Sequence, residues 1–301
     1  PQKYLEAGCL FGKSGDIEDK EMKNSIALFV VFYPGIELFI EDFFNSVINQ
    51  SCKDFDLIIV NDGWKCKNLA NQYQNLHIVE LPGGNSIAKN REIGINYVIK
   101  QKYRYLLLCD ADDTFHPQRV ESSIRALQKY DIVVNDVNIV SVDGQVMVSD
   151  YFCKSLKGNE VLDMDFILKK NIFGFSNTAI KLEQNIECTF PQHLKVVDWY
   201  FFTQLLFVGR RACFIPVSLT NYRQHSNNLI GITSFTVEMF RRLTNLKIEH
   251  FESLSKWNAF FLPYAKEAKS LESLADEEVK VLLDKRQKEN QYPQWWEFIN
   301  Y

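Results

Sequence analysis

The sequence has no long apolar run, little net charge and no internal repeat. Its most membrane-like stretch, residues 199–217, is interrupted by Thr-Gln and by Gly-Arg-Arg, so no segment reaches the length of a membrane span. The net charge of −4 argues against a general nucleic-acid-binding protein, because neutralising phosphates requires a basic surface. We therefore expect neither a transmembrane helix nor a nucleic-acid partner.

Cysteine usage excludes a further class of protein. The seven cysteines are odd in number, scattered along the chain and never arranged as Cys-x-x-Cys. Such usage favours a reducing compartment over a disulfide scaffold, so we expect a cytoplasmic protein. A length of 301 residues with 46% hydrophobic and 24% charged residues is ordinary for one or two globular domains.

Short apolar segments alternate with amphipathic ones from Ser25 onward. We expect strands at 26–33, 56–60, 76–81 and 103–110, helices at 36–49, 86–100 and 117–129, and a hairpin formed by 131–140 and 145–149. Strands and helices that alternate in this way specify a mostly parallel sheet with helices on both faces. The predicted fold class is therefore α/β.

The second half of the chain is less regular and ends in helices alone. Helices are expected near 163–170 and 198–208, and strands at 177–182 and 212–217. We divide the chain into a tail or remnant of added sequence at 1–24, an α/β domain at 25–231 and a helical region at 232–301.

One apolar stripe runs along the helical region, made of Met239, Leu243, Leu246, Leu254, Trp257 and Phe261. Amphipathic helices usually bury such a stripe, so we expect it to pack on the α/β domain or on a second subunit in a homodimer. An alternative is peripheral contact with the inner face of a membrane, because Trp295-Trp296 and the basic residues along the helices suit an interface.

The clearest chemical signal is YLLLCDADDT at 105–114, where an apolar run stops on Asp110, Asp112 and Asp113. This pattern indicates a buried strand whose C-terminal end opens into a crevice, which is where ligands bind in open α/β sheets. Clustered carboxylates there suit a hard divalent cation such as Mg²⁺ or Mn²⁺. The alternative interpretation is a solvated acidic loop that caps the following helix.

Two other expected strands end on polar residues, Tyr33 and Asp62. Parallel strands bring their C-terminal ends together, so these side chains should converge with the acidic cluster. Tyr33 offers a flat face for a nucleobase, and Asp62 can accept a proton from a base or a ribose. Asp62-Gly63 is also an ordinary turn pair.

Three further segments carry candidate site residues. Lys89 and Arg91 lie near the start of the 86–100 helix, where cations beside a helix N-terminus favour a diphosphate, although a solvated face is the usual place for such residues. Asp198 follows two valines at an expected helix start, so it is either a general base or a helix cap. Arg223 and His225 follow a strand and could reach phosphates or the metal.

Taken together, these residues resemble a family 2 glycosyltransferase with a GT-A fold. The resemblance covers residues 25–231 and rests on an ordered set of segments: FYPGIEL, FDLIIVNDG, IAKNREIGI, LLLCDADD, VVDWYFF and YRQHSNN. Each motif is weak by itself, whereas the ordered set is specific. The chain departs from the family pattern at three positions: Pro34 where an Asn is usual, Lys89 where an Arg is usual, and Val197 where an acid is usual.

The resemblance implies metal-dependent, inverting transfer of a sugar from a nucleoside-diphosphate sugar, with UDP favoured, to a hydroxyl of a glycan or lipid-linked acceptor. It implies polysaccharide biosynthesis as the setting and Mn²⁺ or Mg²⁺ as the cofactor. Asp198 would be the catalytic base, and Asp112 with His225 would hold the metal. The residues implied for donor binding are Tyr33, Asp62, Lys89, Asp110 and Arg223.

Two alternatives remain at this point. The D-x-D-x-T pattern at 110–114 also fits a haloacid dehalogenase-type phosphatase with Asp110 as the nucleophile, but that motif normally opens its domain and here several expected elements precede it. The second alternative is a nucleotide-sugar-binding protein on a catalytically dead transferase scaffold. The presence of Asp112, Asp198 and His225 argues against it.

Overall fold

A computed structural model describes residues 25–65, 72–156, 158, 161–182, 188–225 and 236–289. The expected tail at 1–24 and the Trp295-Trp296 pair lie outside the described residues, and so does the expected domain boundary at 231. The three-part division of the chain therefore stays a prediction.

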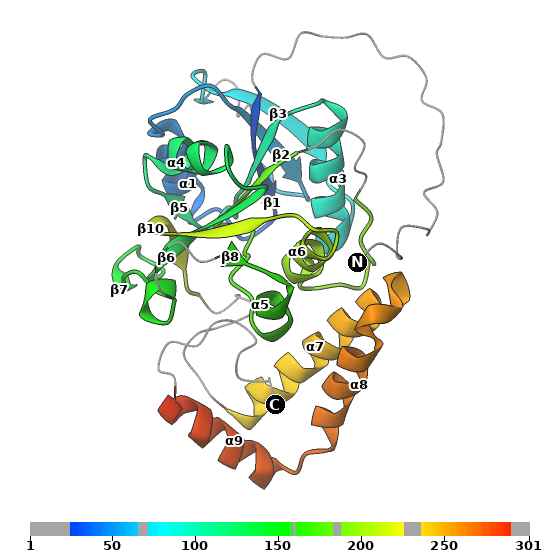
Figure 1. The fold of residues 1–301 in the computed structure, drawn as a ribbon. Helices are drawn as coiled ribbons and strands as arrows, with labels where there is room; N and C mark the ends of the chain where they lie inside the picture. Colours follow the sequence, from blue (N-terminus) through cyan, green and yellow to red (C-terminus); the bar gives the residue numbers. More distant parts are fainter. Residues whose placement is uncertain are drawn as a thin grey trace.

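One mixed sheet forms the centre of the molecule (Figure 1). Its main path runs in the order β3 (His77–Pro82), β2 (Asp56–Asn61), β1 (Ile26–Phe32), β4 (Tyr105–Leu108), β9 (Thr178–Lys181), β6 (Ile132–Val140), β10 (Ala212–Arg223) and β5 (Thr114–Phe115). Two short strands lie off this path: β7 (Val146–Val148) forms the predicted hairpin with β6, and β8 (Val161–Leu162) pairs with β10.

The directions of the strands define one edge of the sheet, at which several of them end and which we call the functional edge. Strands β3, β2, β1 and β4 are parallel neighbours, and β6 and β10 are also parallel to each other. Because β9 runs antiparallel to both β4 and β6, those two strands point the same way. The C-terminal ends of β1, β2, β4, β6 and β10 therefore share one edge with the N-terminal end of β9. This arrangement confirms the predicted α/β fold with a mostly parallel sheet.

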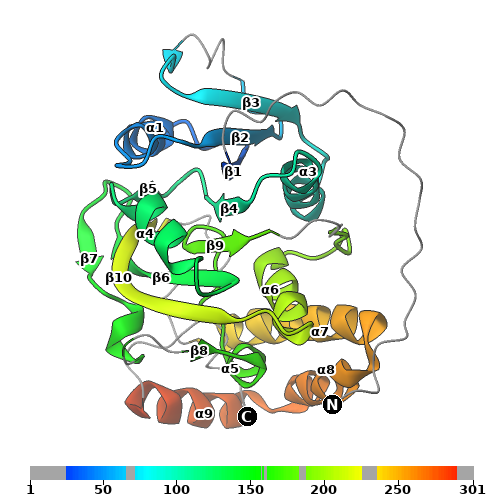
Figure 2. The ribbon, with the colours of Figure 1, turned by 45° about the horizontal axis from the view of Figure 1, so that its top comes forward.

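Helices cover both faces of the sheet and add a layer below it. Figure 2 shows α3 and α6 on one side of the strands, α1 and α4 on the other, and α7, α8 and α9 beneath them. The helix bounds are α1 (Ile40–Ile48), α3 (Ile87–Lys100), α4 (Arg119–Ala126), α5 (Met164–Lys169), α6 (Val197–Phe207), α7 (Val237–Trp257), α8 (Leu262–Ser270) and α9 (Asp276–Glu289). Short 3₁₀ turns occupy Phe152–Lys154, Ala259–Phe261 and Leu271–Ser273.

Strand β1 divides the hydrophobic core into two parts. Its residues alternate between the two faces of the sheet, as the period of two in a strand requires. Phe29 belongs to the cluster shared with α3, α6 and α7, whereas Val30 belongs to the cluster shared with α1 and α4. All seven residues of β1 are buried, which explains why the sequence reads as an uninterrupted apolar run.

Two element boundaries differ from the sequence-based expectation. Helix α1 begins at Ile40 rather than near 36, after turns that include Gly35 at φ +108°. Strand β10 continues to Arg223 rather than ending near 217, because it pairs with β6 along its length through register shifts between Ile215 and Thr220. Tertiary pairing therefore carries Arg223 to the functional edge.

Helix α3 packs so closely on β1 that Gly94 has no room for a side chain. A Cβ atom at this position would collide with the ring of Phe29. We expect Gly94→Ala to lower the free energy of unfolding by about 1–3 kcal/mol, the usual cost of overpacking a core, despite the better helix propensity of alanine. Urea denaturation measures this change, with Lys100→Ala at an exposed position of the same helix as the control. Equal stability of the two variants would contradict the packing.

The predicted apolar stripe packs against the α/β domain. Leu243, Leu246 and Leu254 of α7 are buried in the cluster that also contains Trp199 of α6. Phe261, the last residue of the stripe, is also buried, whereas Trp257 stays 41% exposed. None of the helices within the described ranges combines the length and apolar character needed to cross a membrane.

Candidate active site

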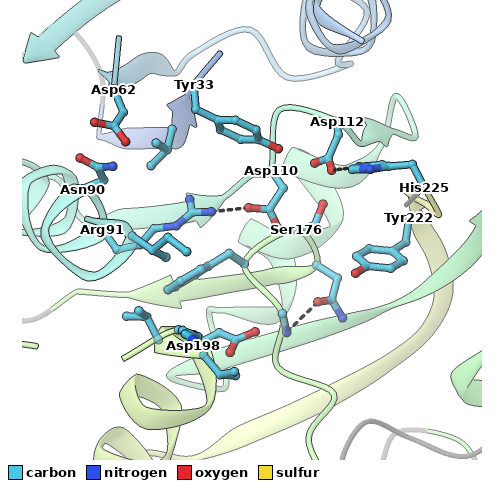
Figure 3. Close-up of a pocket in the computed structure, with 18 residues that line it drawn as sticks. Tyr33, Asp62, Asn90, Arg91, Asp110, Asp112, Ser176, Asp198, Tyr222 and His225 are labelled. Atoms are coloured by element: carbon cyan, nitrogen blue, oxygen red, sulfur yellow. Dashed lines mark hydrogen bonds and ion pairs between the residues drawn. The ribbon is translucent and has the colours of Figure 1, made fainter. Parts of the chain in front are cut away.

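A cavity of about 520 Å³ opens at the edge where the strand ends meet (Figure 3). Its walls come from the ends of β1, β2 and β4, the first turns of α3 and α6, the loop before β9 and the end of β10. Six of the predicted site residues line this cavity: Tyr33, Asp62, Asp110, Asp112, Asp198 and His225. Two predicted residues, Lys89 and Arg223, are not part of the lining.

Tyr33 and Asp62 form one wall of the cavity, directly after β1 and β2. The Asp62 amide continues the pairing of the two strands by donating to the Phe32 carbonyl at 2.7 Å. Tyr33 is 39% exposed, so its ring is free to offer a face to a ligand. The position of both side chains agrees with the expected convergence, and their assignment to a nucleobase stays a prediction.

Arg91, rather than Lys89, is the α3 cation at the cavity. Its guanidinium forms an ion pair with Asp110 (Figure 3). It also lies 4.5 Å from the centre of the Phe175 ring. Burial raises the pKa of Asp110, and the charge of Arg91 opposes that rise. Lys89 instead pairs with Glu92.

Helical geometry explains this difference between the two cations. Residues three or four apart share one face of a helix. Ile87, Asn90 and Arg91 therefore share the face that lines the cavity, and Lys89 points elsewhere. Both cations were expected near the start of this helix, but the family resemblance assigned donor binding to Lys89 rather than to Arg91.

Asp112 and His225 meet at a second part of the wall. His225 Nε2 lies 2.8 Å from Asp112 Oδ2, and the two side chains are only 11% and 13% exposed. The His225 ring also stacks on Phe39 with the centroids 5.3 Å apart. The long β10 brings His225 to the acidic loop, although more than a hundred residues separate the two in sequence.

This pair fits a divalent metal by its donor chemistry. Carboxylate oxygen and imidazole nitrogen are ligands that Mn²⁺ accepts, and carboxylate oxygen also suits Mg²⁺. Among the described residues, no group of three or more His, Cys, Asp or Glu side chains is arranged to enclose a metal. A cation held by Asp112 and His225 would therefore complete its shell with oxygens of a bound diphosphate or with water.

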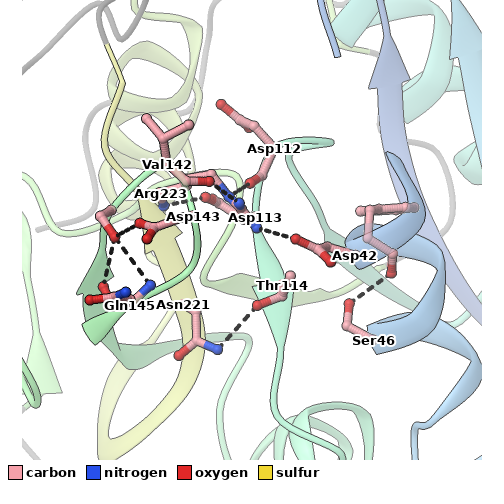
Figure 4. A network of polar contacts seen from close by, with 12 residues as sticks. Asp42, Ser46, Asp112, Asp113, Thr114, Val142, Asp143, Gln145, Asn221 and Arg223 are labelled. Carbon is pink, nitrogen blue, oxygen red and sulfur yellow. Dashed lines mark hydrogen bonds and ion pairs between the residues drawn. The ribbon is translucent and has the colours of Figure 1, made fainter. Parts of the chain in front are cut away.

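Arg223 braces the acidic loop from behind (Figure 4). Its backbone amide donates to Asp113 Oδ1 at 2.7 Å, its Nε donates to the Asp112 carbonyl at 2.9 Å, and its Nη1 donates to the Val142 carbonyl. Nη2 pairs with Asp42 at 2.9 Å, and the side chain is only 4% exposed. The guanidinium is thus committed to the protein, and the predicted phosphate contact of Arg223 has no support from its position.

The third carboxylate of the cluster is structural. Asp113 is buried, and burial together with the nearby charges of Asp112 and Asp110 raises its pKa well above the usual range. Its Oδ1 accepts the hydrogen bond from the Arg223 amide, which ties the acidic loop to β10. The three aspartates are neighbours in sequence, but only Asp110 and Asp112 line the cavity, whereas Asp113 holds the acidic loop to β10.

Asp198 faces the carboxylate–imidazole pair from another side of the cavity (Figure 3). It lies in the first turn of α6, and its Oδ1 accepts the Trp199 amide hydrogen at 2.6 Å. Burial raises the pKa of Asp198 from 3.8 to about 7, although the hydrogen bond from Trp199 opposes the rise. A carboxyl group with a pKa near neutrality is suited to accept a proton at physiological pH.

The loop before β9 contributes residues that sequence analysis missed. Ser176 and Asn177 line the cavity beside Phe175. Asn177 anchors the loop, because its side chain donates to the Asn135 carbonyl at 3.0 Å and accepts from the Gly174 amide at 3.0 Å. This loop lies at the functional edge because β9 runs antiparallel to its neighbours, which brings its N-terminal end there. The sequence gives no local signal for that pairing and therefore none for this loop.

Comparison with known proteins identifies the family. Residues 28–176, which include most of β1, the acidic loop and Ser176, match the model for glycosyl transferase family 2. The chain belongs to glycosyltransferase family 2. This family 2 glycosyltransferase is 24% identical over 204 residues to TuaG of Bacillus subtilis, a protein named for teichuronic acid biosynthesis, covering 64% of this chain and 76% of TuaG.

Solved structures of low sequence identity share the fold. Residues 1–349 of S. aureus TarS, in complex with UDP-GlcNAc, superpose with a TM-score of 0.52 at 16% identity, covering 75% of this chain and 66% of that one. The mannosyltransferase PcManGT from Pyrobaculum calidifontis, with GDP-Man and Mn²⁺, gives a TM-score of 0.50 at 15% identity over 93% of this chain and 84% of that one. These likenesses establish the GT-A fold of this glycosyltransferase.

The phosphatase alternative is not favoured by these findings. Asp110 follows the fourth strand of a family 2 domain rather than the first strand of its own domain. Its carboxylate is also engaged by Arg91, which a free nucleophile would not be. The dead-scaffold alternative is not favoured either, because the chain retains carboxyl groups around a formed cavity.

Proposed function

We propose that this glycosyltransferase moves a sugar from a nucleoside-diphosphate sugar, with UDP as the first choice of nucleotide, to a hydroxyl group of a glycan or lipid-linked acceptor. The observation that carries the proposal is one cavity with two kinds of acidic group. On one side, Asp112 is paired with His225 at 2.8 Å, and on another Asp198 has a pKa of about 7. The first arrangement suits a metal-bound diphosphate, and the second suits a general base.

The donor would bind along the strand ends. Tyr33 and Asp62 would receive the nucleobase, and the Asp110 carboxylate, oriented by Arg91, would accept a hydrogen bond from the ribose. Asp112 and His225 would hold Mn²⁺ or Mg²⁺. When bound, such a cation supplies positive charge beside the leaving diphosphate. UDP is favoured because the TarS structure contains UDP-GlcNAc, although PcManGT contains GDP-Man.

The transfer would be a single displacement. Asp198 removes the proton of an acceptor hydroxyl, and the acceptor oxygen attacks the anomeric carbon from the side opposite the leaving group. The new carbon–oxygen bond forms as the bond to the diphosphate breaks, so the configuration inverts and the proton stays on Asp198. Arg91 and Phe175 line this cavity, with the guanidinium 4.5 Å from the centre of the Phe175 ring. The name of TuaG, which refers to teichuronic acid biosynthesis, favours polysaccharide biosynthesis as the setting.

A ligand-binding experiment tests the donor and metal assignments. We expect UDP with Mn²⁺ to raise the melting temperature, because a ligand at 100 times its Kd stabilises the folded state by about 2.7 kcal/mol. EDTA should remove most of this increase, and Asp112→Asn should abolish the Mn²⁺-dependent part. Differential scanning fluorimetry with UDP, GDP, CDP and dTDP also identifies the preferred nucleotide.

The matched control is Asp54→Asn, which changes the same chemical group at an exposed position outside the cavity lining. It should respond to UDP and Mn²⁺ as the unmodified protein does. No response to any of the four diphosphates would contradict the proposed donor class. A response that is identical with EDTA would contradict the metal assignment alone.

The cytoplasmic location, the homodimer and the peripheral membrane contact through 232–301 stay predictions. The first rests on cysteine usage in the sequence. The homodimer rests on the apolar stripe of the helical region, of which Trp257 is a partly exposed member. The membrane contact rests on Trp295-Trp296 and the basic residues along the helices.

A further inference from the structure

The first turn of α6, which carries Asp198, receives no cap from the side chain of its N-cap residue. The N-cap residue is Val196, whose side chain has no hydrogen-bond acceptor and therefore caps none of the backbone amides. Asp198 accepts the Trp199 amide rather than an amide further along. A helix start whose N-cap residue has no acceptor gains little stability from capping, so contacts from elsewhere in the fold contribute more to its position.

One turn of α7 supplies such contacts. Glu249 Oε1 accepts the Lys195 amide hydrogen at 3.2 Å, and Ser253 Oγ lies 3.0 Å from His193 Nε2. Between them, His250 stacks face to face on Trp199, with ring centroids 3.8 Å apart and planes 8° apart. We call Glu249, His250 and Ser253 the α7 clamp.

The contacts of the clamp fall on both sides of Asp198. Lys195 lies three residues before the carboxylate and Trp199 one residue after it. Trp199 is fully buried, and its Nε1 donates to the Ile167 carbonyl of α5 at 2.8 Å. The indole is therefore fixed on one side by α5 and on its face by α7. Asp198 and Trp199 are joined by a peptide bond, and the Asp198 carboxylate accepts the Trp199 amide hydrogen. Contacts that hold the indole in place therefore also limit the movement of the carboxylate.

His250 contributes to the clamp as a neutral aromatic ring. It is 1% exposed, and neither ring nitrogen has a hydrogen-bond partner among the described residues. Burial and the nearby charge of Lys247 lower its pKa well below the usual value. A ring that stays neutral and makes no hydrogen bond acts through its flat face, so a phenyl ring should replace it.

We propose that the C-terminal helical region completes the catalytic centre, with His250 acting as a positioning residue for Asp198 through the Trp199 indole. This inference rests on the proposed function, in which Asp198 is the general base. The helical region then contributes to catalysis by positioning the general base, in addition to packing on the α/β domain. Donor-binding groups lie on the strand ends and are not in contact with the clamp, so donor affinity should be insensitive to it.

The test compares His250→Ala with His250→Phe. A misplacement of about 1 Å can cost about 10²-fold in rate, so we expect His250→Ala to lower kcat by about 10- to 100-fold. The Kd of UDP with Mn²⁺ should change by no more than about twofold, because the lost interaction acts only on the chemical step. His250→Phe should restore most of the rate. Rates are measured as UDP release from a panel of UDP-sugars, and Kd by calorimetry.

A double variant separates positioning from general stability. In the Asp198→Asn background, adding His250→Ala should cause no further loss of rate, since the group that it positions is already gone. The same fold-loss in both backgrounds, or a full rate in His250→Ala, would overturn the inference. Wild-type activity of Asp198→Asn would instead overturn the proposed base, whatever the clamp variants do.

A second pair of variants covers a folding failure of His250→Ala. Glu249 is only partly buried, so its replacement is less disruptive. Glu249→Ala removes the acceptor of the Lys195 amide, whereas Glu249→Gln keeps an oxygen in its place. We expect the alanine variant to lose rate with unchanged UDP affinity and the glutamine variant to behave as the unmodified enzyme. Equal rates in both would again overturn the inference.

Discussion

Asp198→Asn is expected to lower the rate of glycosyl transfer by about 10²–10⁴-fold, the usual contribution of a general base. The amide matches the carboxylate in size and can still accept the Trp199 amide hydrogen, so the fold should be unaffected. UDP binding in the presence of Mn²⁺ should also persist, because Asp198 is not among the proposed donor-binding groups. The measurement is UDP release from a UDP-sugar, with Asp165→Asn at an exposed position as the control.

The same residue predicts the pH dependence of the rate. Only the ionised carboxylate can remove a proton, and burial raises the pKa of Asp198 to about 7. The rate should therefore increase with pH up to about 7 and then level off, falling about tenfold for each pH unit below that value. A rate that stays flat down to pH 5 would exclude Asp198 as the base. The residual activity of Asp198→Asn should lack the ascending limb.

Stability should follow the opposite direction with pH. Because the pKa of Asp198 is higher in the folded protein than its ordinary value of 3.8, the protonated form favours the folded state. That contribution is complete below pH 3.8 and is lost as pH rises through about 7. Asp198→Asn should thus be more stable relative to the unmodified protein at pH 8 than at pH 5. Urea denaturation at the two pH values measures the difference.

Arg223→Met is expected to destabilise the protein by about 3 kcal/mol, since a buried acceptor that loses its partner costs about 1–3 kcal/mol. Methionine keeps part of the apolar stem but leaves the carbonyls of Asp112 and Val142 without their donor. Asp42 is 53% exposed and can turn to water, so its share of the loss is small. Urea denaturation measures the loss.

The role of Arg223 separates two interpretations of the sequence. If it braces the acidic loop, the Mn²⁺-dependent increase in melting temperature should shrink in Arg223→Met because Asp112 loses its support. UDP affinity without metal should change little. If Arg223 contacts the diphosphate, UDP affinity without metal should fall as well. Asp42→Asn is the matched control, because it weakens the outer ion pair and keeps the two carbonyl contacts.

The fold class and the edge of the sheet that carries the site follow from local patterns in the amino-acid sequence. Short apolar segments alternating with helices require a mostly parallel sheet, and parallel strands collect their C-terminal ends at one edge. Tyr33, Asp62 and the acidic loop follow three such strands, so their convergence is a local consequence of strand direction. Asp198 was visible as an acid at a helix start within an apolar context.

Which of several similar residues face the cavity depends instead on contacts between distant segments of the chain. The phase of helix α3 brings Arg91, and not Lys89, to the cavity wall. The pairing of β10 with β6 places the Arg223 guanidinium against the backbone of the acidic loop, outside the cavity lining. The antiparallel β9 brings Ser176 to the edge, which no local pattern encodes. Helix α7 packs beside Asp198 for the same reason: contacts between distant segments follow from how helices and strands bury their faces together, not from the spacing of residues along the chain.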